Sequence, residues 1–139
     1  MTTRQYLSQI DTLNKKIQNK IIEEEQLREL ATNVSSIGSG ERVQASGSGD
    51  RTANIVAKMI DVQRETNDLV DQLLVKKSDV IRTIETVSSV KLYEVLFKRY
   101  VECKSLGEIS DEMSYSVQYI KKLHFQALEE VQRIKNFKC

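Results

Sequence analysis

The sequence contains no proline and no tryptophan, and it has only two cysteines and one histidine among 139 residues. The absence of proline permits long uninterrupted helices, because proline removes a helical hydrogen bond and its ring clashes with the preceding turn. Cys103 and Cys139 lack the spacing of a metal site and are too few for a disulfide framework, so we expect free thiols. His124 and scattered carboxylates provide no paired nucleophile and base, so we expect neither an enzyme nor a bound metal or cofactor.

Long apolar runs are also missing. No stretch approaches the roughly 20 apolar residues that a membrane-spanning helix needs. No basic start followed by an apolar segment suggests a signal peptide. We therefore expect a cytoplasmic protein without a membrane partner. The formal net charge of +1 gives no global field that would attract nucleic acid, so any binding of DNA has to be argued from local groups.

Residues 3–33 are predicted to form a helix. Apolar residues recur there every three or four positions, as on one face of a helix: Tyr6, Ile10, Leu13, Ile17, Ile21, Leu27 and Leu30. The following residues, 35–50, are rich in serine and glycine, a composition typical of a flexible loop. Asp50, at the end of this loop, is predicted to cap the next helix by accepting hydrogen bonds from its free backbone N–H groups.

A second long helix is predicted over residues 51–87, where apolar residues recur at nearly coiled-coil spacing. Each of the two helices has one apolar stripe and needs a partner for it. The simplest solution is a long antiparallel helical hairpin, coiled-coil-like, within one chain. Dimerisation of two chains through the same stripes is the alternative. The expected domains are therefore a helical hairpin over 1–88, with the 35–50 loop at its tip, and a second domain over 89–139.

The second domain has the pattern of three shorter helices, the first of them from about Leu92. Ser105 and Glu108 have the spacing of a capping box, which marks the start of a short helix. This helix is predicted to stop near Ser114, and Ser116 is predicted to cap a longer helix. A short helix, a tight turn and a longer helix make a helix-turn-helix unit. The sequence thus predicts an all-α chain in which a hairpin is followed by a small helix-turn-helix domain.

The outward face of the last helix suits the major groove of DNA, which admits one helix and offers donors and acceptors on its base edges. Lys121 and Lys122 are expected to meet phosphates, which supply most sequence-independent affinity, as are Lys98, Arg99 and Lys104 nearby in sequence. The residues predicted to contact double-stranded DNA are Ser116, Val117, Gln118, Tyr119, Lys121, Lys122 and Gln126.

Residues 105–128 resemble, without a gap, the helix-turn-helix of the fourth region of bacterial sigma factors. The matching stem and closing positions are Leu106, Ile109, Ala127 and Leu128. The whole chain is similar to short prophage proteins of Gram-positive bacteria, related in outline to ArpU-type phage late-gene regulators; residues 41–51 and 56–58 carry much of this likeness. The resemblance implies a phage transcription regulator that binds promoter-region DNA and contacts RNA polymerase, associated with the nucleoid of a bacterial host.

The chain departs from sigma factors where those proteins tend to read bases with arginine, glutamate and glutamine. It has Val117, Gln118 and Lys122 at these positions, so the usual upstream promoter hexamer is not the expected target. It also has no second sigma region, which melts DNA, so it is not expected to open a promoter alone. Two other functions remain open: a DNA-packaging recognition subunit of the small-terminase type, and a module without DNA affinity that docks on RNA polymerase.

Overall fold

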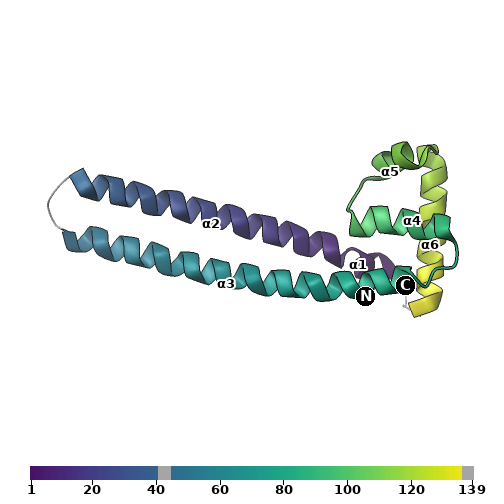
Figure 1. The fold of residues 1–139 in the computed structure, drawn as a ribbon, viewed down its shortest axis with the longest axis horizontal. Coiled ribbons are helices and arrows are strands. Elements are labelled where there is room, and N and C mark those ends of the chain that lie inside the picture. The colour runs from purple at the N-terminus through teal and green to yellow at the C-terminus, as the bar shows by residue number, and fades with distance from the viewer. Residues whose placement is uncertain (41–44, 136–139) are drawn as a thin grey trace. The chain divides into compact units, whose positions relative to one another are not determined.

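The computed structural model describes residues 1–40 and 45–135. Every element in these two ranges is helical, so the predicted all-α class is confirmed (Figure 1). In chain order the elements are α1 (Thr3–Leu7), α2 (Gln9–Gly40), α3 (Ala45–Ile84), α4 (Val90–Leu96), the π-helix η1 (Phe97–Val101), α5 (Leu106–Met113) and α6 (Val117–Lys135). The first predicted helix is therefore divided between α1 and α2, with a short interruption at Ser8.

The chain forms two compact units. Unit 1 combines residues 1–13 with the chain from residue 72 onward, and unit 2 comprises residues 14–71. This division differs from the expected boundary between residues 88 and 89. The reason is that the first turn of α2 and the last turn of α3 supply apolar side chains, such as Ile10 and Ile84, to a core shared with α1 and the helices after α3.

Within unit 2, α2 and α3 lie side by side and run in opposite directions (Figure 1). The Lys20 ammonium is 2.7 Å from the Glu65 carboxylate. Further along α2, the Glu24 carboxylate accepts a hydrogen bond of 3.1 Å from Gln63. The partner numbers rise along α2 as they fall along α3, which is the pattern of an antiparallel pair.

The expected loop over residues 35–50 is replaced by helix at both of its ends. Residues 35–40 continue α2 and residues 45–50 begin α3, so Asp50 lies inside α3 and does not cap it. Residues 41–44 lie outside the described part of the chain. Glycine disfavours a helix by about 1 kcal/mol relative to alanine. Extending an existing helix, however, adds a hydrogen bond for each residue without a new nucleation cost.

Unit 1 is built around α6, which packs against α1, α4 and α5. Its larger core cluster consists of the buried side chains of Tyr6, Leu7, Ile10, Val80, Ile84, Val87, Leu96, Tyr100, Val101, Ala127 and Val131. A smaller cluster joins α4, α5 and α6 through Val95, Ile109, Ile120 and Leu123. The two clusters together bury α6 on one side along most of its length.

The helix predicted from Leu92 changes character before it ends. It starts as α4, where Ser89 accepts a hydrogen bond from the Leu92 N–H, and then widens into η1. The Glu102 N–H donates to the carbonyl of Phe97, five residues back, at 3.0 Å. Cys103 follows with a left-handed backbone (φ 59°), which turns the chain toward α5.

Candidate nucleic-acid interface

The start of α5 is fixed by the predicted capping box. The Ser105 hydroxyl accepts a hydrogen bond from the Glu108 N–H, and the Glu108 carboxylate accepts one from the Ser105 N–H, both at 3.1 Å. The helix ends at Ser114, whose backbone is left-handed (φ 60°, ψ 42°). The Ser110 hydroxyl then donates to the Tyr115 carbonyl at 2.7 Å. These bonds fix the turn that sets the direction of α6.

Ser116 caps α6 as predicted, because its hydroxyl accepts a hydrogen bond of 3.1 Å from the Tyr119 N–H. The inward face of α6 is buried throughout, through Ile120, Leu123, His124, Ala127 and Val131. A helix anchored at its start and along one whole side presents the opposite side to a ligand without needing to move.

The outward face of α6 carries the residues predicted to contact DNA. Exposed side chains are those of Ser116, Val117, Gln118, Lys121, Lys122 and Gln126, while Tyr119 is half-buried. At 3.6 residues per turn, Gln118 and Lys122 share one ridge along the helix. Phe125 continues that ridge and is 62% exposed. Sequence reasoning missed Phe125, because an aromatic residue at helical spacing is normally a core residue.

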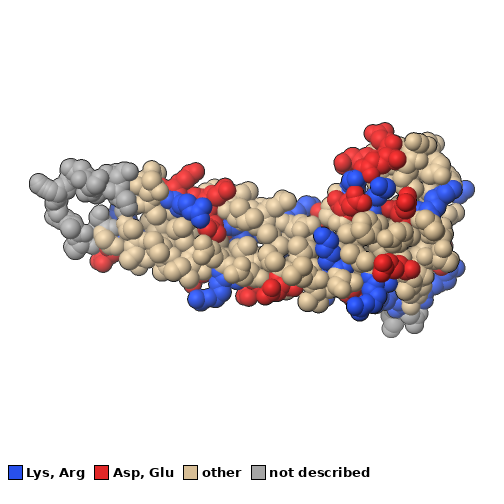
Figure 2. Space-filling view, viewed as in Figure 1, with Lys and Arg blue, Asp and Glu red and all other residues tan. Residues whose placement is uncertain are grey.

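The charges on α6 are available to a ligand. Neither Lys121 nor Lys122 has an ion-pair partner among the residues that the structure describes. In Figure 2 basic side chains lie at the outer edge beside α6, and acidic side chains gather over α5. α6 is therefore the more basic of these two helices.

Three other basic residues that were expected to meet phosphates are engaged within unit 1. The Glu112 carboxylate accepts hydrogen bonds from Lys104 and, at 2.8 Å, from Lys98. Lys104 also pairs with Glu102 at 2.8 Å, and Arg99 donates to the Lys104 carbonyl at 2.9 Å. Hydrogen bonds from Lys104 and Lys98 lower the pKa of Glu112, so its charge persists and offsets theirs.

Lys91 provides a cation at the start of α6 that the sequence did not reveal. Its ammonium lies 3.4 Å from the Tyr119 hydroxyl and 5.3 Å from the centre of the Tyr115 ring. Hydrogen bonding to Tyr115 and Tyr119 raises the pKa of Lys91, which keeps it charged. The two tyrosine rings meet edge to face, with centroids 4.9 Å apart. No local pattern predicts this group, because Lys91 belongs to α4.

Behind the interface lies the only histidine of the chain. His124 is buried, and its Nε2 is 2.6 Å from the Tyr100 hydroxyl. The two rings are stacked, with centroids 5.6 Å apart. Burial, followed by the positive charges of Arg4 and Arg99, lowers the pKa of His124 to about 4. The neutral ring is thus a hydrogen-bonded part of the core.

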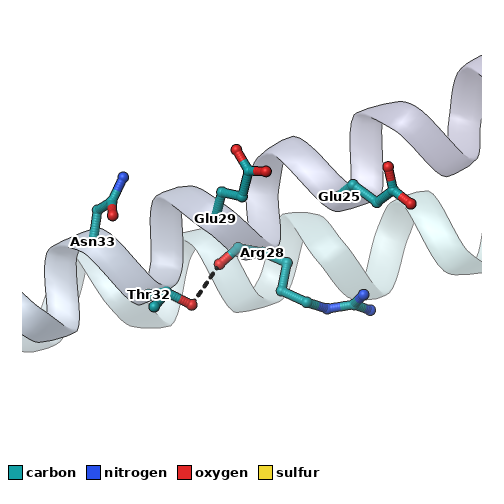
Figure 3. Close-up of a pocket in the computed structure, with 5 residues that line it drawn as sticks. All are labelled: Glu25, Arg28, Glu29, Thr32 and Asn33. Atoms are coloured by element: carbon teal, nitrogen blue, oxygen red, sulfur yellow. Dashed lines mark hydrogen bonds between the residues drawn. The ribbon is translucent and has the colours of Figure 1, made fainter.

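A concave surface of unit 2 is shown in Figure 3. It is lined by Glu25, Arg28, Glu29, Thr32 and Asn33, all from α2. The Thr32 hydroxyl donates to the Arg28 carbonyl at 3.0 Å, and the Arg28 guanidinium pairs with Glu24 at 2.6 Å. A polar hollow lined by a single helix, whose one basic side chain is paired within that helix, is typical of a solvated helix face.

Residues 1–40 and 45–135 contain neither a metal-binding cluster nor a membrane-spanning helix. No group of histidine, cysteine, aspartate and glutamate side chains in these ranges is arranged to hold a metal ion. None of the helices described there combines the length and the apolar character needed to cross a bilayer.

Comparison with known proteins identifies no relative. No protein-family model matches the chain, and neither a curated protein nor a solved structure does. The assignment of the interface consequently rests on the chemistry and the geometry of α6 and its neighbours.

Proposed function

We propose that α5 and α6 form a helix-turn-helix unit that binds double-stranded DNA with α6 in the major groove. The observation that carries the proposal is the two-sided character of α6. Its inward face is fully packed, whereas Gln118, Lys121, Lys122 and Gln126 are all exposed on the other face. A packed helix with an outward row of amide and ammonium groups has what major-groove recognition needs.

Electrostatics support the same orientation. Lys121 and Lys122 have no acidic partner among the described residues, and Lys91 is held next to the start of α6. Phosphate contacts by such cations position a protein on the duplex, and they supply most of its sequence-independent affinity. Glu112 of α5 is already paired with Lys98 and Lys104, so its charge is offset.

The glutamines give the interface its means of reading sequence. A glutamine side chain forms two hydrogen bonds with the N6 and N7 atoms of adenine, and lysine donates to the O6 and N7 atoms of guanine. Gln118 lies in the first turn of α6, the part of a recognition helix that normally meets the bases. Together with the likeness to the fourth sigma region, this favours a phage-encoded, sigma-like transcriptional regulator that acts at promoter-region DNA.

The second part of the proposal concerns α2 and α3, which we take to be a coiled-coil-like hairpin used for assembly. In unit 2, Val56, Ile60 and Val70 lie on one side of α3 and are 44%, 49% and 37% exposed. A second copy of the chain that covered this side would make a homodimer, and a dimer binds two DNA half-sites separated by about one helical turn or a multiple of it. Docking of the same side on RNA polymerase is the competing use.

The proposal predicts that the protein retains promoter-region fragments in a pull-down of host and phage genomic DNA followed by sequencing. The Lys121→Ala/Lys122→Ala variant should lose this enrichment, because it removes the two unpaired cations of α6. Lys76→Ala/Lys77→Ala serves as the matched control, since it removes an adjacent lysine pair from α3, and it should retain the enrichment.

The alternatives give different results. Enrichment of a packaging site, together with a ring of many subunits in sedimentation, would replace the regulator with a DNA-packaging subunit. Failure of every fragment to bind at low salt would contradict DNA binding and leave docking on RNA polymerase. Equal loss in the two lysine variants would mean that the binding is non-specific and does not use the α6 face.

A further inference from the structure

Phe125 is an unpacked aromatic residue near the C-terminal limit of the proposed DNA-binding face. It is 62% exposed, although α6 has a complete apolar face on its other side. It lies three residues after Lys122 and seven after Gln118, which places all three side chains on one ridge of the helix. An aromatic ring at this position therefore faces the same ligand as Gln118 and Lys122.

The floor of the major groove has one kind of apolar group, the C5-methyl group of thymine. Hydrogen-bond donors and acceptors occupy the other readable positions on the base edges, and a phenyl ring has no use for them. Burial of a methyl group against an aromatic side chain is favourable because both leave water. Phe125 consequently matches thymine and no other base of unmodified DNA.

We propose that Phe125 reads the methyl group of a thymine in the major groove. This inference rests on the proposed DNA-binding function, and it identifies thymine as the base that Phe125 contacts. Residues 118 and 125 are about 10 Å apart along the helix axis, which corresponds to roughly three base pairs. The thymine therefore lies about three base pairs from the base that Gln118 contacts.

The residues around Phe125 mark the limit of the contact. Lys121, one turn before Phe125, is exposed and basic, whereas Glu129, one turn after it, is exposed and acidic. The carboxylate of Glu129 is repelled by phosphates, so the DNA-facing part of α6 ends between Phe125 and Glu129. Phe125 is accordingly the last side chain on this ridge that reaches the bases.

The test uses the full-length protein and a short duplex taken from a fragment that it enriches. Each thymine is replaced in turn by deoxyuridine, which pairs identically and lacks only the methyl group, and affinity is measured by fluorescence anisotropy. One or two replacements should weaken binding about three- to fivefold, the value of one buried methyl group. Phe125→Ala should bind the thymine and the deoxyuridine duplexes equally, with about the affinity of the wild-type protein for the deoxyuridine duplex.

Ile134→Ala is the matched control, because Ile134 is an exposed apolar residue on α6 beyond Glu129. It should keep the wild-type preference for thymine. If every deoxyuridine duplex binds the wild-type protein as well as its thymine counterpart does, methyl readout is wrong and DNA binding stands. Methyl readout by Phe125 would also be wrong if the Phe125→Ala variant kept the preference for thymine. The same conclusion would follow if that substitution converted a dimer to a monomer. Absence of binding to any duplex would remove the proposed function as well.

Discussion

The Tyr100–His124 pair shows how one residue couples α6 to the core behind it. The pair is buried between η1 and α6, where Nε2 of the neutral imidazole and the hydroxyl of Tyr100 share a hydrogen bond of 2.6 Å. Burial raises the pKa of Tyr100, so its hydroxyl remains protonated. Protonation of His124 would place a charge in the core.

Acid should therefore destabilise the fold through His124. The folded pKa of about 4 lies below the unfolded value of 6.5. The stabilisation is complete above pH 6.5 and is lost as the pH falls toward 4, by about 2–3 kcal/mol in total. Urea unfolding of the wild-type protein and of His124→Gln, followed by circular dichroism across this range, measures the difference. Parallel stability curves for the two proteins would show that His124 does not titrate as the structure indicates.

At the helix ends, local sequence predicts some features well and fails for others. It predicts the capping serines, but it does not predict the left-handed residues at which helices end. The roles of Ser89, Ser105 and Ser116 as caps follow from residue type and spacing alone. The left-handed backbones of Cys103 and Ser114 could not be predicted, because this conformation normally selects glycine. The loop predicted over residues 35–50 is wrong for 35–40 and 45–50, which are helical, because the serine and glycine content overstated the tendency of the helices to stop.

Ser114→Gly should stabilise unit 1 by about 0.5–1 kcal/mol. Ser114 adopts a left-handed backbone at the end of α5, where its Cβ is strained and a glycine is not. The gain exceeds the extra entropy that glycine adds to the unfolded chain. Thermal or urea unfolding measures the change, with Ser114→Ala as the control that keeps the strain. A glycine variant no more stable than the alanine variant would contradict the assigned geometry.

For the molecule as a whole, the sequence predicted the all-α fold class and most of the exposed residues of α6, but not Phe125 and not the charge balance around α6. Short-range patterns predict which side of a helix faces the core. They do not reveal that Glu112 neutralises Lys98 and Lys104, or that Lys91 of α4 joins the start of α6. These relations link residues brought together only by the packing of α4, η1, α5 and α6.

This charge balance predicts the salt dependence of DNA binding. Lys121, Lys122, Lys91 and up to two further contacts give a slope of log affinity against log salt of about −3 to −5 for one protein on B-DNA. The slope for the Lys121→Ala/Lys122→Ala variant should be less steep by about 2. Anisotropy titrations at several salt concentrations check both values. A flat response in the wild-type protein would contradict phosphate contact by these lysines.

The core of unit 1 joins residues that are far apart in the sequence, and this affects how the protein is made. Leu7 and Ile10 are synthesised long before Ala127 and Val131 of α6, yet the four residues share a cluster. Contacts so distant in sequence form late and slow the folding of a domain. The N-terminal apolar side chains therefore remain uncovered during synthesis until α6 is complete. A chain terminated before α6 would expose them permanently and become a substrate for chaperones and proteases, which links the presence of α6 to survival of the chain.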